Sequence, residues 1–207
     1  RLMPYFYEMS VKAHHTGVPV MKPMVLAFDQ DPAVRYLDMQ YMLGDSLLVA
    51  PIFEEDGKVD YYLPDGKWTH LLSGEVKEGG RWFSDKYDYF SLPLYVRENT
   101  LLAIGANEER PDYDYVQELS LHLYQLRDGK QAAVQVPDLA GETKLTASAR
   151  RQGDQIELEV SQLTPGLQFV FHDVTVKSVS GGTITAKGDQ ATIIPTATKL
   201  KVEISTE

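Results

Sequence analysis

Short apolar and alternating stretches run along most of the chain, and the longest apolar stretch lies in the motif QYMLGDSLLVAPIF at residues 40–53. After a break at Gly44-Asp45, the segment Leu47–Phe53 has apolar residues on both faces. A strand of this kind must be covered on both faces. Burying each large side chain contributes about 1.5–3 kcal/mol relative to exposure. The pattern therefore predicts a central sandwich strand within a principal core.

An amphipathic helix is predicted at residues 2–15, before this motif. Its apolar residues recur at steps of four, three and four along one face: Leu2, Phe6, Met9 and Ala13. Gly17 provides a stop signal. Further apolar residues at 3, 7 and 11 widen the stripe beyond what one small sheet can cover. We therefore expect one apolar side of the helix to be exposed or to contact another copy, and the other to pack near residues 47–53.

Short β segments with the spacing of an antiparallel sandwich follow the helix. They are predicted at residues 47–53, 59–63, 68–72, 82–83, 94–97 and 101–104, after a strand-like segment at 20–28 and a short helix with Asp31 as its N-cap and Pro32 at its first position. Of 21 aromatic residues, 16 precede residue 96, so the composition changes near Ile104. The polar segment Gly105–Pro111 is interpreted as a linker.

The second half is predicted to be all-β. Leucines at 119, 121 and 123 alternate with polar residues, as in a half-buried strand. Asp128-Gly129 predicts a hairpin turn into residues 131–136. Further strands are predicted at residues 144–151, 155–161, 167–172, 174–179, 183–186, 191–194 and 199–204. The fold class is therefore mainly β: two consecutive antiparallel sandwiches at 21–106 and 107–207, preceded by a helical segment at 1–20.

Composition narrows the functional classes. A chain of 207 residues can hold two cores. The net charge of −10 is spread evenly over both halves, which argues against a nucleic-acid surface. The absence of cysteine excludes disulfides and thiolate chemistry, and no apolar run approaches the length of a membrane span. The chain starts at Arg1 without a signal-peptide pattern. We therefore expect a cytoplasmic protein whose true N-terminus lies upstream.

Histidines and charge runs offer few candidate sites. His14 and His15 are adjacent, so on a helix their side chains point about 100° apart and cannot share one metal ion in the usual way. Three other histidines lack a neighbour at ligand spacing, and each is interpreted as a strand residue with a satisfied ring: His70, His122 and His172. The run Glu54-Glu55-Asp56 before Gly57 resembles a solvated turn more than a metal cluster.

Asp112 and Asp114 are the best candidates for a paired-carboxylate site. They alternate with Tyr113 and Tyr115, which would place both carboxylates on one face of a strand. Like charges held close together would raise one of the two pKa values. An edge strand with solvated acids explains the same pattern and is the favoured interpretation.

Six aromatic residues could form a platform for a sugar ring: Tyr61, Tyr62, Trp68, Trp82, Tyr87 and Tyr89. Packing between two sheets explains the same residues and is favoured, because large aromatics dominate cores. A binding face would need two of these rings exposed and coplanar.

Several motifs together resemble the C-terminal part of family-31 glycoside hydrolases. They are LMPY at residues 2–5, GVPVMKPM at 17–24, QYMLGDSLLVAPIF at 40–53, YLPDGKW at 62–68, GGRW at 79–82 and LPLYVR at 92–97. Four segments are most similar to the bacterial α-xylosidase branch of the family, with the α-glucosidases next: YLDMQYMLGDSLLVAPIF, WTHLL, RENTLLAIG and RPDY. The resemblance is strong up to about residue 115 and thinner beyond it.

The resemblance implies a place in a larger enzyme. In that family a (β/α)₈ barrel carries catalysis and is followed by a proximal and a distal β-sandwich. Residues 1–20 would then be the last barrel helix, 21–106 the proximal sandwich and 107–207 the distal sandwich. The barrel would be the partner, in the same chain, and a homo-oligomer is a further possibility.

The same resemblance implies that catalysis lies outside these residues. The family's reaction uses two carboxylates, one as nucleophile and one as acid/base, on barrel loops upstream of Arg1. The family's Trp-x-Asp nucleophile motif does not occur here. We therefore assign no catalytic, substrate-binding or metal residue and no cofactor, and an α-xyloside or α-glucoside substrate would concern only the parent enzyme.

Two other classes of protein fit the pattern less well. A stand-alone carbohydrate-binding module using exposed Trp and Tyr is the main alternative, but such a module has no need of a wide apolar helix ending in a glycine stop. A purely structural interaction protein would also lack a site and would have no parent enzyme.

Overall fold

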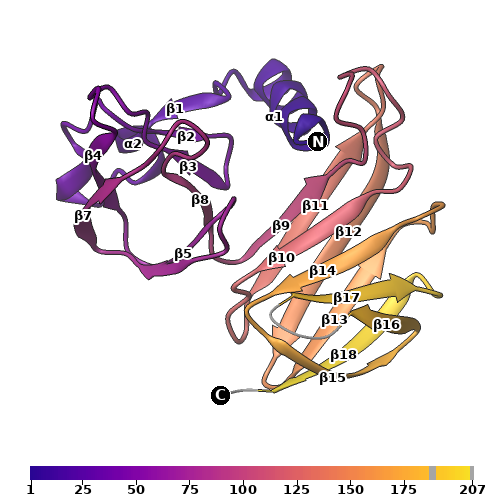
Figure 1. The fold of residues 1–207 in the computed structure, drawn as a ribbon. Helices are drawn as coiled ribbons and strands as arrows, with labels where there is room; N and C mark the ends of the chain where they lie inside the picture. Colours follow the sequence, from indigo (N-terminus) through magenta and orange to yellow (C-terminus); the bar gives the residue numbers. More distant parts are fainter. Residues whose placement is uncertain (187–189, 206–207) are drawn as a thin grey trace. The chain divides into compact units, whose positions relative to one another are not determined.

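The chain folds into two compact units in a computed structural model that describes residues 1–186 and 190–205. The N-terminal unit is Lys12–Glu98, and the C-terminal unit combines Arg1–Val11 with Asn99–Glu207. Both are built almost entirely of antiparallel strands (Figure 1), and α1 is the single helix of seven or more described residues. The predicted mainly-β fold class is confirmed.

The predicted helix forms as α1, Met3–Thr16. Pro4 sits in its first turn, where the missing N–H costs nothing. At the other end Gly17 has a φ of +74°, and its N–H donates to the carbonyl of Ala13. Met9 is buried, whereas Phe6 and Ala13 are half-buried. The first eleven residues belong to the C-terminal unit, where Tyr7 packs against the core.

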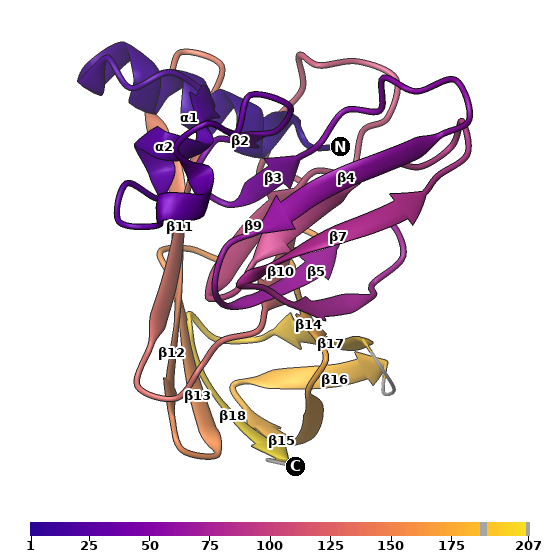
Figure 2. The same ribbon diagram turned by 90° about the vertical axis from the view of Figure 1, so that its left-hand side faces the viewer.

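The N-terminal unit contains the 40–53 motif in its largest sheet, but the strand predicted at 47–53 ends at Val49. Its six-stranded sheet has the order β1 Met21–Pro23, β2 Tyr41–Leu43, β3 Leu47–Val49, β8 Leu94–Arg97, β5 Lys67–His70 and β6 Val76–Glu78. All three residues of β3 are buried between its two neighbouring strands. A ribbon of β4 Lys58–Leu63 and β7 Arg81–Lys86 completes the unit (Figure 2). Trp68, Tyr61 and Tyr95 are the largest side chains in its core.

The break in the motif has a structural role. Gly44 has a φ of +68°, a conformation that glycine adopts without steric cost, and it turns the chain from β2 into β3. The next residue, Asp45, accepts hydrogen bonds from the ammonium groups of Lys12 and Lys22. Burial raises the pKa of Asp45, but the bonds from both lysines outweigh it and leave that pKa below its usual value. Asp45 therefore ties the end of α1 to β1.

Two local predictions in this unit need correction. The strand-like segment 20–28 contains only the short β1, followed by the four-residue helix α2, Met24–Ala27. Pro23 provides the extended residue at the helix N-cap, so the chain leaves the sheet there. Strand β6 was not predicted, because Val76-Lys77-Glu78 is mostly polar and its pairing with β5 is not visible in a local pattern. The predicted Asp31 cap is confirmed, since its carboxylate accepts from the N–H of Ala33 ahead of the 3-10 turn Pro32–Val34.

The C-terminal unit is a sandwich of two five-stranded sheets. One has the order β16 Gly182–Ala186, β17 Gln190–Pro195, β14 Gln168–His172, β10 Ser120–Tyr124 and β9 Thr100–Ile104. The other has the order β11 Gln131–Pro137, β12 Thr143–Gln152, β13 Gln155–Val160, β18 Lys199–Ser205 and β15 Thr175–Ser180. Alternate residues of both sheets, such as Leu121, Phe169, Leu158 and Val202, fill one core between them. The pair β10 and β14 is parallel, unlike the other pairs described.

The units divide earlier than the sequence suggested. The compact units separate between Glu98 and Asn99, whereas the change in composition placed the boundary at residue 106. Strand β9 was assigned to the first sandwich, but it pairs along its whole length with β10 of the C-terminal unit. Aromatic content reports what fills a core and not which strands pair, so it misplaced this strand.

The predicted hairpin at Asp128-Gly129 is also wrong. The turn exists, and Gly129 has a φ of +71°. However, β10 and β11 lie in different sheets, so the chain crosses the sandwich here instead of folding back on its neighbour. A turn signal specifies the local backbone and leaves the strand partner open.

Candidate functional site

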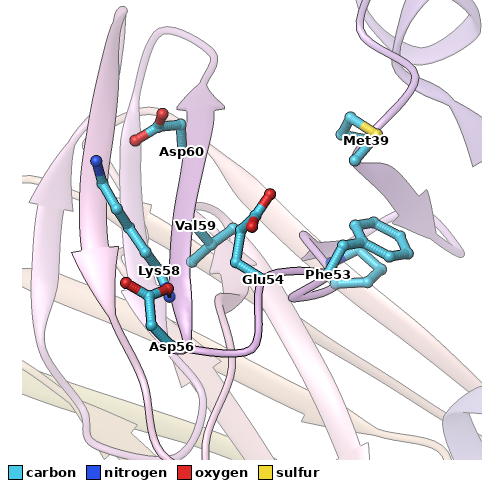
Figure 3. Close-up of a pocket in the computed structure, with 8 residues that line it drawn as sticks. Met39, Phe53, Glu54, Asp56, Lys58, Val59 and Asp60 are labelled. Carbon is cyan, nitrogen blue, oxygen red and sulfur yellow. Dashed lines mark hydrogen bonds between the residues drawn. The ribbon is translucent and has the colours of Figure 1, made fainter.

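A pocket of about 430 Å³ opens beside the end of the 40–53 motif (Figure 3). Phe53 and Met39 form one side of it and are 66% and 54% exposed. Asp56, Lys58 and Asp60 stand on the other side, with Val59 and Glu54 between them (Figure 3). The chain reaches this position because Pro51 ends the pairing after β3 and directs it toward β4.

A second cavity of about 640 Å³ shares Glu54 and Asp56 with the first. Its other wall comes from the segment after β7, including Tyr87 and Tyr89. Tyr89 and its neighbour Phe90 are almost fully exposed. The two cavities are therefore neighbours, and exposed aromatic rings and mainly acidic side chains surround them. Within residues 1–186 and 190–205, no three His, Cys, Asp or Glu side chains converge as metal ligands would.

A buried polar network holds the β4–β7 ribbon to the sheet. The Lys77 ammonium lies 2.6 Å from Asp85 Oδ2 and 3.0 Å from Tyr61 Oη, and 4.9 Å from the centre of the Phe83 ring. Tyr61 Oη also lies 2.8 Å from Tyr95 Oη. Burial raises the pKa of Asp85, but hydrogen bonds from Lys77 and Tyr61 outweigh it, so the pKa lies below its usual value.

The tyrosines of this network, and Tyr62 on the same strand β4, are neutral near neutral pH. Burial, followed by hydrogen bonds with neighbouring acceptors, raises the pKa of Tyr61 far above that of a free phenol. Burial likewise raises the pKa of Tyr95. For Tyr62, burial and a 2.9 Å hydrogen bond to Asp31 raise the pKa to about 12. Phenols that stay neutral and keep their hydrogen bonds in this way stabilise the fold.

Asp112 and Asp114 do not form a paired site. They lie in a loop and not on the predicted edge strand. Asp112 accepts a hydrogen bond from Arg110 Nε at 3.0 Å, and Asp114 accepts one from Lys144 Nζ at 2.8 Å. The hydrogen bond from Arg110 lowers the pKa of Asp112, and the bond from Lys144 lowers that of Asp114. Each carboxylate therefore has its own cation, and the pKa rise that a shared site requires is not found.

The histidine predictions hold in part. His14 and His15 are both exposed, with ring centres 5.3 Å apart in an edge arrangement. His70 is buried with a satisfied ring, as predicted: Nε2 contacts the Leu92 carbonyl at 2.8 Å and Nδ1 accepts from the N–H of Ser73.

Sequence reasoning missed a histidine pair in the C-terminal unit. His122 Nδ1 lies 2.9 Å from His172 Nε2, and the Tyr124 ring stacks on His172 with centres 4.1 Å apart. The parallel pairing of β10 with β14 brings these residues together although fifty positions separate them. No local pattern signals such a pairing. Burial, with a contribution from the neighbouring ring, lowers the pKa of His122 to about 3, and burial lowers that of His172 to about 4.

This pair makes the stability of the C-terminal unit depend on pH. Both imidazoles are neutral in the fold, whereas in the unfolded chain they gain protons as the pH falls through about 6.5. The contribution of this pair to the stability of the unit is therefore fully present above about pH 6.5, and it declines as the pH falls toward 4. We expect the melting temperature, followed by near-UV circular dichroism, to drop between pH 6.5 and 5 in the wild type.

A double variant, His122→Gln with His172→Gln, should give a flatter profile over the same interval. The carboxylates with lowered pKa values do not titrate there, so they leave the comparison clear. Equal slopes in both proteins would show that the pair does not control this dependence.

The aromatic set mostly fills the core. Trp68, Tyr61 and Tyr62 are buried and Tyr87 is half-buried, which confirms packing for these rings. Trp82, 56% exposed, lies 5.7 Å from the Tyr62 ring at a tilt of 54°. That tilt rules out a flat platform made by these two rings.

Comparison with known proteins accounts for both units. The model of the glycosyl hydrolase family 31 C-terminal domain matches residues 17–102, and that of the C-terminal domain of the alpha-xylosidase YicI matches residues 114–206. The two matches together leave little of the chain unassigned. They define a C-terminal β-sandwich region of a glycoside hydrolase, and the chain belongs to glycoside hydrolase family 31.

Among individual relatives, the alpha-xylosidase XylQ of Lactiplantibacillus pentosus is 37% identical over 83% of this chain and 23% of its own length. An alpha-xylosidase of Emericella nidulans is 34% identical over 54% of this chain and 15% of its own length. The chain thus spans less than a quarter of the length of these relatives.

Solved structures share the fold at lower identity. A cycloalternan-forming enzyme from Listeria monocytogenes matches 98% of this chain over 22% of the enzyme's own chain, with a TM-score of 0.82 and 21% identity. A dextranase from Flavobacterium johnsoniae matches 98% of this chain over 31% of the dextranase's own chain, with a TM-score of 0.80 and 17% identity.

Among the described helices, none has the length and apolar character needed to cross a membrane.

Proposed function

We propose that this chain is the non-catalytic C-terminal region of a retaining α-glycosidase and that it braces the catalytic barrel of the same polypeptide. Among the α-glycosidases, an α-xylosidase is the preferred assignment. The curated relatives of this chain include two proteins named alpha-xylosidase and one named alpha-glucosidase 2. The family's nucleophile motif, Trp-x-Asp, does not occur in these residues. The two carboxylates that the reaction needs would lie in the barrel.

The observation that carries this proposal is how α1 is held. Glu8 Oε1 accepts from the N–H of Gln135 at 3.0 Å, and Tyr7 Oη donates to the Leu139 carbonyl at 2.7 Å. The Tyr7 ring meets Tyr115 edge-on at 5.7 Å. The C-terminal unit therefore binds one side of the helix through these contacts. Phe6 and Ala13, on another side of the helix, remain partly exposed.

A half-covered helix of this kind fits the last helix of a barrel. In such a barrel the remaining apolar positions would pack against the strands. Through α1, the C-terminal sandwich would then hold the barrel directly, and the binding energy of these contacts would stabilise the catalytic domain.

The direct test of this proposal is activity. The isolated 207-residue chain is expected to release no p-nitrophenol from p-nitrophenyl α-xyloside, because the reacting carboxylates are absent. A longer polypeptide that includes the upstream barrel is expected to release it. Activity of the isolated chain that persists through repurification would overturn the proposal.

Only two of the six rings proposed for a sugar platform are exposed, Trp82 and Tyr89. Four of the six rings proposed for a platform are buried or half-buried, and they pack within the N-terminal unit. The non-catalytic brace is therefore the function that we retain.

A further inference from the structure

Exposed apolar side chains are concentrated in one unit. Of the fifteen large hydrophobic residues that are exposed in the described part of the chain, twelve lie in the N-terminal unit, although it is the smaller of the two. The other three are Leu139, Leu163 and Ile194. Large exposed apolar areas on a folded domain usually mark a contact surface.

The part of this surface with the clearest shape is the region that we call the Phe53 face: Met39, Phe53 and the acidic residues Glu54, Asp56 and Asp60 that line one pocket. Figure 3 shows Phe53 and Met39 opposite the charged side chains. An aromatic wall facing carboxylates suits a long cationic side chain, whose stem packs on the ring while its head meets the acids.

The charges of this face are not balanced by other residues in the part of the chain that the structure describes. The two neighbouring cavities are lined by five carboxylates, from Glu54, Glu55, Asp56, Asp60 and Asp88, and by only two ammonium groups, from Lys58 and Lys86. None of these seven side chains forms an ion pair with another described residue. By contrast, Asp45, Asp85 and Asp114 elsewhere in the chain each pair with a lysine.

From these observations we infer that the Phe53 face docks onto the catalytic barrel of the same polypeptide, and that its pocket receives an arginine or lysine side chain of that barrel. The inference rests on the proposed function and adds the place and the chemistry of the contact. Relatives of this chain are more than four times as long as the region they share with it, so a polypeptide of their length would carry the partner surface outside the shared region.

Other occupants fit the Phe53 face less well. A second copy in a symmetric contact would place the same acidic residues opposite each other, which is unfavourable. A metal ion would need converging ligands, and no group of three converges within the described residues. A neutral sugar would leave the excess negative charge without a partner.

The test compares the same variants in two forms of the protein: the longer polypeptide with the barrel, and the 207-residue chain. Phe53→Ser removes the apolar wall, and Glu54→Lys reverses a charge on the rim. Matched controls in the C-terminal unit are Ile194→Ser, which removes another exposed apolar side chain, and Glu142→Lys, which reverses another exposed acid.

In the longer polypeptide, Phe53→Ser and Glu54→Lys are each expected to lower the melting temperature by about 2 °C or more, because the first removes the apolar wall of the contact and the second places a like charge against the cationic side chain that the pocket receives. In the 207-residue chain the same changes should leave it unchanged, since both side chains are exposed there. The control variants should leave it unchanged in both forms.

Three results would overturn the inference: equal shifts in both forms, no shift in the longer polypeptide, or a dimer of the 207-residue chain that Phe53→Ser dissociates. Hydrolysis of p-nitrophenyl α-xyloside by the longer wild-type polypeptide reports on the proposed function separately. An active enzyme that is insensitive to these variants would refute the docking face alone.

Discussion

Replacing Leu48 by aspartate is expected to prevent the N-terminal unit from folding. Leu48 is fully buried at the centre of β3, with Met42 on one neighbouring strand and Tyr95 on the other. The substitution removes the packing of a leucine, about 3–5 kcal/mol, and buries an unpaired carboxylate at a cost of several kcal/mol more. A unit of this size has a total stability of roughly 4–13 kcal/mol, so the change removes most or all of it.

Tryptophan fluorescence can follow this loss in one unit alone, because Trp68 and Trp82 both lie in the N-terminal unit. Trp68 is fully buried, and its emission should shift to the red in Leu48→Asp at temperatures where the wild type is folded. The control is Leu72→Asp, which places the same charge at a position that is 56% exposed and should leave the emission unchanged. A Leu48→Asp variant that melts like the wild type would show that β3 is not central.

The sequence was most informative where local patterns determine structure. The alternation of leucines around residue 121, the stop at Gly17 and the Asp31 cap each follow from the chain's own periodicity or from one side chain reaching a nearby N–H. Short β segments separated by glycine and proline gave the fold class, and the family resemblance gave the parent enzyme. The alternation, the glycine stop and the cap each extend over only a few residues.

The features that the sequence did not reveal depend on which distant strands pair. Strand β9 joins the C-terminal unit because it pairs with β10, and His122 meets His172 because β10 and β14 run parallel. The pocket beside Phe53 arises where the chain after β3 approaches β4. The run from Glu54 to Asp56 is a solvated turn in sequence terms, and only the fold shows that an exposed aromatic ring stands against it.

The buried ion pair of the N-terminal unit should have the second largest effect on stability. The Lys77 side chain is only 11% exposed and contacts Asp85, which is 32% exposed. Removing one member of a buried pair leaves an uncompensated charge at a cost of about 3–5 kcal/mol, and the partial exposure of Asp85 reduces this toward about 2–3 kcal/mol for Asp85→Ala. The tryptophan-detected midpoint in urea should fall accordingly.

The double variant Lys77→Met with Asp85→Ala separates the charge from the packing. Once the ammonium is removed as well, no buried charge lacks its partner, so the double variant should be more stable than Asp85→Ala alone. If the double variant is instead the less stable of the two, the ammonium is adequately held by Tyr61 and the surrounding rings. In that case the carboxylate is not what keeps Lys77 in place.

Acid provides an independent check on the same pair. The pKa of Asp85 is lowered in the fold, so its contribution is complete above the unfolded value of about 3.9 and disappears as the pH falls through the folded value. The difference in stability between wild type and Asp85→Ala should therefore be constant from pH 7 to about 5 and shrink below about pH 4. A difference that does not shrink at all as the pH falls through the acid range would mean that Asp85 acts through packing, because a protonated carboxyl group cannot balance the charge of Lys77.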